Sequence, residues 1–304
     1  MKLATAALLA LLLALPVIAA EEVTSHPLLE LARGRALAPG KVERGASDGS
    51  AVRQARHALE QARVPADAEC AAAIGAARFA ELYVELAASN AEAGDLAAAA
   101  DAYRRAHTCR PHDANILAAL AGVLFDARDL RGTREAINAS LAIDPRSVSA
   151  NRIAANLDFV EERWADAISR FRYVASSDED RRQAGYGQLM YWLAQLRGGI
   201  SKPEFVTRTP SEYWPQPLLL YMRGEYTEAE LVGPVTAGDR DDNIIPNTGT
   251  DERLCEALFY VGEEYWARGQ PEVARDYFAA LVNLKVLYFL EHGLALVEIA
   301  KLRR

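Results

Sequence analysis

ELYVELAASNAEAGDLAAAADAYRRAHTCRP, residues 81–111, is the stretch that decides the fold. Its apolar and small residues recur at helical spacing on both sides of Gly94, which indicates two helices joined by a turn. Ala99 follows the turn, and Tyr103 comes four residues later. A small residue where two helices cross closely, followed by a large one on the same face, is what stacked helix pairs need. The stretch therefore predicts one helix pair that ends near Pro111.

The same pattern returns further along the chain. The proline that ends the quoted stretch has a counterpart 34 residues later in Pro145, and two such steps take Ala99 to Ala167 and Tyr103 to Phe171. A helix–turn–helix unit of this length resembles the tetratricopeptide repeat (TPR) family. The resemblance implies an all-α solenoid of helix–turn–helix units, and it favours a scaffold over an enzyme.

The net charge of the chain argues against two classes of partner. The chain has 304 residues, of which 51% are hydrophobic, and its net charge is −8. A nucleic-acid surface needs a basic stripe, so no nucleic acid is expected as a partner. An acidic protein is equally unsuited to anionic membrane headgroups.

The N-terminus predicts export. Lys2 precedes an uncharged run from Leu3 to Leu15, and Pro16 comes before the candidate cleavage points Ala19 and Ala20. This is the pattern of a signal peptide at residues 1–20, with an uncleaved membrane anchor as the alternative. No cysteine follows the run, so a lipid attachment site is not expected. We predict a periplasmic or otherwise secreted protein without stable membrane insertion after cleavage.

The remaining chain divides into three parts. Residues 21–64 are expected to form an N-terminal helical extension and a linker, and residues 65–181 a TPR array of three repeats. The array begins inside a helix that is predicted to run from about Ala66 to Ala93. Residues 182–304 are expected to hold a degenerate repeat, one further TPR and a capping helix, Leu287–Leu302, that covers the exposed end of the array. Val235–Thr250 is polar and predicts a surface loop.

A second resemblance covers about the last ninety residues. It rests on Trp214-Pro215, the run RLCEALFYVG at 253–262, and Glu291-His292 with Ala295 and Glu298. These residues resemble the C-terminal region of NlpI-type TPR proteins. That resemblance implies an envelope adaptor that brings peptidoglycan hydrolases, synthases and a processing protease together. Such proteins are typically lipid-anchored at an N-terminal cysteine, which this chain lacks, and no catalytic residue of the family carries over.

Three local patterns imitate catalytic or metal sites. Ser47 lies in a G-x-S-x-G motif, but no buried strand precedes it, as a nucleophile elbow requires. His107, Cys109 and His112 lie close together without a fourth zinc ligand. The third pattern imitates a calcium loop but lacks its glycine and closing glutamate, and its residues are Asp239, Asp241 and Asn243. We therefore expect no metal, no cofactor and no catalytic residue, and we interpret His292 as a packing or capping residue.

The concave face of the array remains as the candidate binding surface. Its predicted residues come from the first helix of each pair and are Val84, Asn115, Phe125, Arg152, Asn156, Phe159, Gln188 and Tyr191. Arg152 and Asn156 lie one turn apart and resemble half of the carboxylate clamp by which some TPR domains hold a peptide C-terminus. Arginine pairs with a carboxylate through two hydrogen bonds, and asparagine can hold the peptide backbone. A solvated polar face is the alternative.

The three cysteines leave two arrangements open. Cys70 and Cys109 are the candidates for a disulfide, but an unbroken helix would place them about 15 Å too far apart. A bridge therefore requires the chain to turn near Gly75. Without that turn both residues are small buried hydrophobes, and Cys255 is expected to be free and buried in either case.

Taken together, the residues and the two resemblances favour an exported, non-catalytic adaptor whose partners are other envelope proteins or peptides. Two alternatives stay open: a periplasmic enzyme or enzyme subunit that presents substrate on its repeats, and a structural subunit of a secretion or outer-membrane assembly complex. The sequence also leaves open that the protein forms a homodimer.

Overall fold

The computed structural model describes residues 26–36, 49–62, 67–177, 181–206, 214–237, 250–286 and 289–303. In these ranges the regular elements are all helices, which confirms the predicted all-α class. The predicted signal peptide and most of the predicted linker, residues 37–48, lie outside them.

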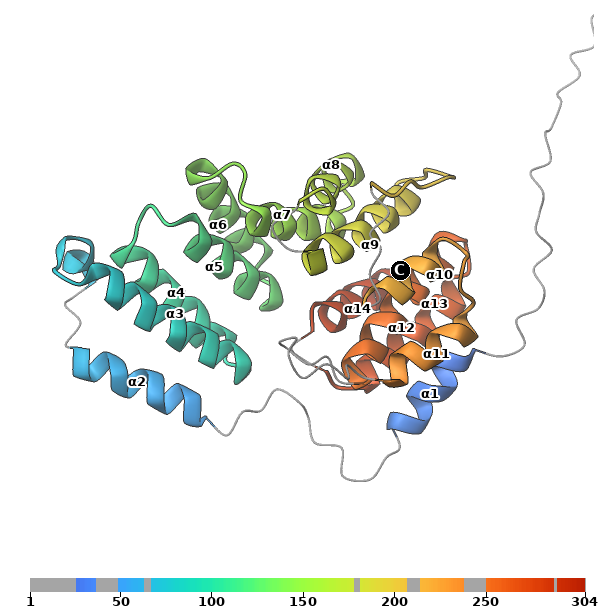
Figure 1. Cartoon of the computed structure of the whole chain (residues 1–304), viewed down its shortest axis with the longest axis horizontal. Helices are drawn as coiled ribbons and strands as arrows, with labels where there is room; N and C mark the ends of the chain where they lie inside the picture. The colour runs from blue at the N-terminus through green and yellow to red at the C-terminus, as the bar shows by residue number, and fades with distance from the viewer. Residues whose placement is uncertain are drawn as a thin grey trace, which may run out of the picture.

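Three successive helix pairs occupy the region of the predicted repeats (Figure 1). They are α3 (Ala76–Glu92) with α4 (Leu96–Cys109), α5 (Ala114–Asp126) with α6 (Leu130–Ile143), and α7 (Val148–Val160) with α8 (Trp164–Ala175). Caps set several of the boundaries. The carboxylates of Asp95 and Asp129, 34 residues apart, accept hydrogen bonds from the amides of Ala98 and Gly132 and so begin α4 and α6. The repeat in sequence thus becomes a repeat in helix length and start.

The packing positions read from the sequence are buried. Ala99 and Ala167 are 0% exposed where the second helix of a pair crosses the first, and Tyr103 and Phe171 fill the space beside them. A larger side chain at either alanine would push the crossing helices apart, because protein interiors are packed to crystal density. The spacing therefore encodes close helix contact directly.

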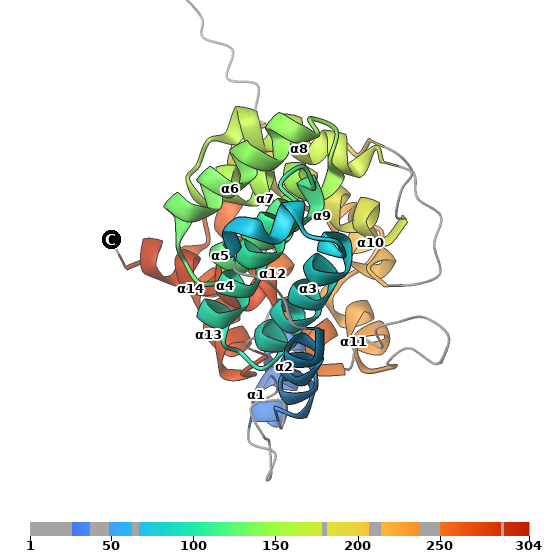
Figure 2. The same ribbon diagram turned by 90° about the vertical axis from the view of Figure 1, so that its left-hand side faces the viewer.

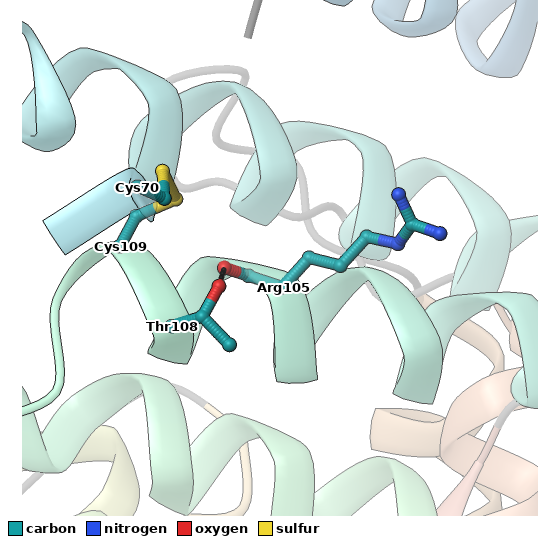
Figure 3. Close-up of a disulfide and its surroundings, with 4 residues drawn as sticks. All are labelled: Cys70, Arg105, Thr108 and Cys109. Carbon is teal, nitrogen blue, oxygen red and sulfur yellow. Dashed lines mark hydrogen bonds between the residues drawn. A yellow bond between two sulfur atoms is a disulfide. The ribbon is translucent and has the colours of Figure 1, made fainter. Parts of the chain in front are cut away.

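The predicted continuous helix over 66–93 is wrong. A 3-10 helix, η1 (Asp67–Ala72), comes first, and the chain reverses at Gly75, whose φ of 95° favours glycine, before α3 starts. This break brings Cys70 to the end of α4, where it forms a disulfide with Cys109 at a Cα–Cα distance of 4.7 Å (Figure 3). The disulfide joins η1 to the first repeat.

The C-terminal third forms a compact helical bundle that follows α9 (Arg181–Arg197). Its helices are α10 (Gln216–Met222), α11 (Glu228–Ala237), α12 (Thr250–Ala267), α13 (Pro271–Asn283) and α14 (Leu290–Lys301). The further repeat predicted within residues 182–304, at Arg253–Ala267 and Pro271–Val282, falls on α12 and α13. Sequence reasoning missed α11, which runs into the start of the predicted polar loop, while residues 238–249 lie outside the description.

The predicted N-terminal extension divides between two places. α1 (Pro27–Ala36) packs against α11, α12 and α13, whereas α2 (Ser50–Ala62) packs against α3 at the other end of the molecule. Figures 1 and 2 show both helices along one edge, far apart along the long axis. The backbone amide of Leu28 donates a hydrogen bond of 3.0 Å to Glu228, so α1 belongs to the C-terminal bundle.

α14 corresponds to the helix that the sequence predicted to cover the end of the array. It packs on α12 and α13, on the side of the bundle that faces the helix pairs (Figure 1). A guanidinium nitrogen of Arg128, after α5, donates to the carbonyl oxygen of Gly293, and Lys301 pairs with Glu162, after α7, at 3.2 Å. α14 therefore contacts residues of the second and third helix pairs as well as the bundle.

Candidate functional site

The face of α7 that the sequence singled out carries Arg152 and, one turn later, Asn156. Asn156 is 1% exposed, and its side-chain nitrogen has no hydrogen-bond partner among the residues that the structure describes. Arg152 is half-buried, and in the same described part of the chain we find no hydrogen bond or ion pair made by its guanidinium. A buried donor without an acceptor is costly, so this pair is poised for a ligand that supplies oxygen atoms.

The surroundings of Arg152 are acidic. Burial lowers its pKa, while the negative charges of Asp126 and Glu291 act in the opposite direction. Glu291, in the first turn of α14, is 6% exposed and accepts a hydrogen bond from the hydroxyl of Tyr260 at 3.5 Å. Burial also raises the pKa of Glu291 to about 7, against the influence of Tyr260 and Arg152. Two carboxyls of the chain itself, those of Asp126 and Glu291, thus lie within electrostatic range of the candidate clamp.

Turn residues complete the site. Arg128 and Glu162 follow the first helices of the second and third pairs and take φ values of 64° and 60°. The equivalent position in the first pair is Gly94, with φ 80°. Each of the two charged residues contacts α14, one near its start at Gly293 and one near its end at Lys301. These contacts place α14 next to the face that carries Arg152.

The structure does not bring all eight predicted face residues together on an open surface. Five of them are buried: Phe125, Asn156, Phe159, Gln188 and Tyr191. Phe159 shows the reason, because its ring packs edge-to-face against Trp164 and Phe171 and so fills the contact between helices. Of the other three, Asn115 is exposed, while Val84 and Arg152 are half-buried. Arg152 therefore does not face solvent freely.

The residues that carry the NlpI-type resemblance are buried in the bundle, and some of the polar ones bond to other buried polar groups. Glu256 on α12 accepts hydrogen bonds from the hydroxyl of Tyr186 at 2.9 Å and from the indole nitrogen of Trp214. At the other end of α12, Arg197 pairs with Glu263 and with Glu298 of α14. These groups tie α9, α12 and α14 together, although one carboxylate oxygen of Glu263 has no hydrogen-bond partner among the described residues.

Of the three local patterns set aside in the sequence, the structure describes only the one around Cys109. Cys109 is bonded to Cys70, so it has no thiolate to offer a metal, and the hydroxyl of Thr108 bonds to the carbonyl of Arg105 one turn earlier (Figure 3). Across the described ranges no group of three His, Cys, Asp or Glu side chains is arranged to hold a metal ion. Ser47, and the calcium-like residues Asp239, Asp241 and Asn243, lie outside those ranges.

Sequence reasoning missed Arg128, Glu162 and Glu291 as members of the site. Two of them had a signal: the 34-residue register places Arg128 and Glu162 where the first pair has Gly94, so charged residues occupy a turn position that suits glycine. Glu291 had none, because nothing in the local sequence shows that α14 folds back toward α5 and α7.

No protein-family model matches the sequence, and no curated protein matches it either. Among the described residues, no helix combines the length and the apolar character needed to cross a bilayer.

Proposed function

We propose that the chain is an exported TPR-type scaffold that holds partner proteins in the cell envelope by an exposed peptide carboxylate. Arg152 supplies the positive charge, and the side-chain nitrogen of Asn156 supplies a second donor one helical turn away. Supporting this is one observation above the others: a buried asparagine nitrogen without an acceptor beside a half-buried arginine without a direct ion pair. A ligand with two acceptor oxygens would give the guanidinium of Arg152 and the side-chain nitrogen of Asn156 the hydrogen-bond partners that they lack among the described residues.

The proposal assigns binding and no chemistry of its own. The partners that fit are envelope proteins with a free C-terminus or an acidic segment, and peptidoglycan hydrolases or a periplasmic protease follow from the NlpI-type resemblance. Helix pairs stacked in register support it further, because such stacks offer an extended face built from many elements.

The test compares two conservative substitutions. Lysine keeps the charge of arginine but cannot pair with a carboxylate through two parallel hydrogen bonds. Arg152→Lys should therefore reduce the proteins recovered on immobilised full-length protein from a cell-envelope extract, as measured by quantitative mass spectrometry. Arg131→Lys is the matched control, because Arg131 is 91% exposed on α6. It should recover the same proteins as the wild type.

A second measurement uses a defined probe. An acidic heptapeptide with a free α-carboxylate should bind the wild type and lose affinity about 10-fold or more with Arg152→Lys, since a charge-assisted pair contributes about 1.5–3 kcal/mol. Its C-terminal amide should bind weakly to both. Equal binding of the acid and amide forms by both proteins would sink the proposal.

A further inference from the structure

Backbone strain is concentrated around α14. Among the described residues, the non-glycine residues with positive φ are Arg128 at 64°, Glu162 at 60° and Lys285 at 58°. L-residues adopt this region rarely and at a cost, and such outliers gather at functional positions. Lys285 lies in the turn that leads from α13 toward α14, and the other two contact α14 itself.

These contacts are not neighbour contacts of a repeat stack. In a stack each pair packs on the next one, so its curvature is free to change over the whole length. The negative charge of Glu291 at the start of α14 acts on Arg152, as that of Asp126 does. Two contacts cross that curve: Arg128 to the carbonyl of Gly293, and Glu162 to Lys301. We call them the closing contacts, because they join the second and third helix pairs to the C-terminal bundle.

The groups around the closing contacts resemble those of a bound peptide. The start of α14 carries the carboxyl of Glu291 and the carbonyl oxygen of Gly293. The array carries Arg128 and Arg152, with the carboxyl of Asp126 close enough to act on both. A peptide that ends in a carboxylate presents the same two kinds of acceptor. The chain therefore holds, next to its candidate clamp, a copy of the groups that a ligand would bring.

We propose that the first turn of α14 is an internal competitor for the carboxylate site, so that an acidic peptide binds by opening the closing contacts. This inference rests on the proposed function, since it names what the site must displace. Opening needs no unfolding of α14, because α14 packs on α12 and α13 and is tied to α9 through Arg197 and Glu298, so these helices would shift together as one body. Side-chain exposure of 52% at Glu162 and 20% at Lys301 makes this pair weak enough to break.

Glu162→Gly is the informative variant. Glycine accepts φ 60° without strain, so the substitution removes the contact to Lys301 and leaves the backbone of the turn in place. Arg128, Arg152 and Asn156 remain. The acidic heptapeptide should bind this variant about two- to fivefold more tightly than the wild type, the change expected for loss of one exposed ion pair. The melting temperature should not fall.

Glu135→Gln is the matched control, because it removes the same charge at a position on α6 that is 72% exposed. It separates competition from a general attraction of acidic peptides to a less negative protein, and it should leave peptide affinity unchanged.

A readout without ligand uses spin labels on Arg131→Cys and Glu272→Cys, at 91% and 77% exposed positions of α6 and α13. Their distance distribution should be narrow in this double variant, and broader and shifted to longer distances when Glu162→Gly is added. Unchanged distances together with unchanged peptide affinity would overturn the internal competitor. If Arg152→Lys abolishes peptide binding and Glu162→Gly leaves the affinity unchanged, the internal competitor is overturned and the proposed function stands. If no variant binds the peptide, the proposed function is overturned as well.

Discussion

At Gly187 the backbone of α9 comes close to the end of α8. A Cβ built there would lie 2.9 Å from the backbone nitrogen of Ala175 and 2.9 Å from a methyl group of Val174. Backbone atoms cannot rotate away as a side chain can, so the two helices would have to separate. The absence of a side chain at this position therefore sets the distance between the last repeat and α9.

We predict that Gly187→Ala lowers the free energy of unfolding by about 1–3 kcal/mol, the usual cost of overpacking. Gly122→Ala in α5 is the control, because its Cβ would meet only Ile153 at an ordinary 3.8 Å. That change should be neutral or stabilising by up to about 1 kcal/mol, since alanine favours helix more than glycine does. Denaturant unfolding of both variants checks the difference, and equal effects would contradict the packing argument.

The second prediction at this scale concerns Glu263. Its side chain is 0% exposed, and it shares Arg197 with Glu298, which is buried to the same degree. Burial is the main reason that the pKa of Glu263 rises to about 7, and the second carboxylate adds to the shift while Arg197 opposes it. A raised pKa in the folded state means that the folded chain binds the proton more tightly than the unfolded chain.

The stability from this group is therefore fully present below the ordinary pKa of about 4.5 and is lost as the pH rises through about 7. Between pH 8 and pH 5 the wild type should gain up to about 2–3 kcal/mol relative to Glu263→Gln, which has no proton to bind. Glu272→Gln, at a 77% exposed position, should follow the wild type. Chemical denaturation at both pH values measures this, and parallel pH profiles of wild type and Glu263→Gln would refute it.

At the scale of elements, the disulfide has a direct effect on the first repeat. It joins η1 to the end of α4 across a sequence separation of 39 residues. In the chain-entropy description, closing a loop of this size stabilises the fold by about 4 kcal/mol. Replacement of Cys70 and Cys109 together by alanine should lower the free energy of unfolding by up to this amount.

Thiol counting under denaturing, non-reducing conditions gives an independent check. One free thiol per chain is expected, from the buried Cys255. Three thiols in the wild type, with a stability equal to that of the double alanine variant, would show that the bridge does not form.

The positions of the helix pairs were the part of the fold that the sequence predicted best. The small–large spacing at Ala99 and Tyr103 located helix pairs because it reports contact between neighbouring elements, which is local in the chain. The break at Gly75 was identified only as a condition for the disulfide, since alanine-rich sequence on both sides is compatible with one long helix.

At the scale of the whole molecule, the sequence predicted less. Arg152 and Asn156 were placed correctly on one face of one helix, because a separation of four residues fixes that relation. Their burial was not predictable, since it depends on which residues of other helices pack around α7, and no periodicity reports such contacts. The same applies to α1, whose apolar residues gave no indication of their partner.

The position of α1 also has a consequence in time. Leu28 bonds to Glu228, which follows it by 200 residues, so a ribosome that adds about 5–20 residues per second needs roughly 10–40 s to make the second after the first. Throughout that interval Leu28, Leu29 and Ala32, all almost completely buried in the finished fold, have not yet met the helices that cover them. The order of synthesis and the order of assembly are therefore opposite at this end of the chain: the first of the described helices to be made is among the last to be packed, and the bundle is complete only when both ends of the polypeptide have arrived.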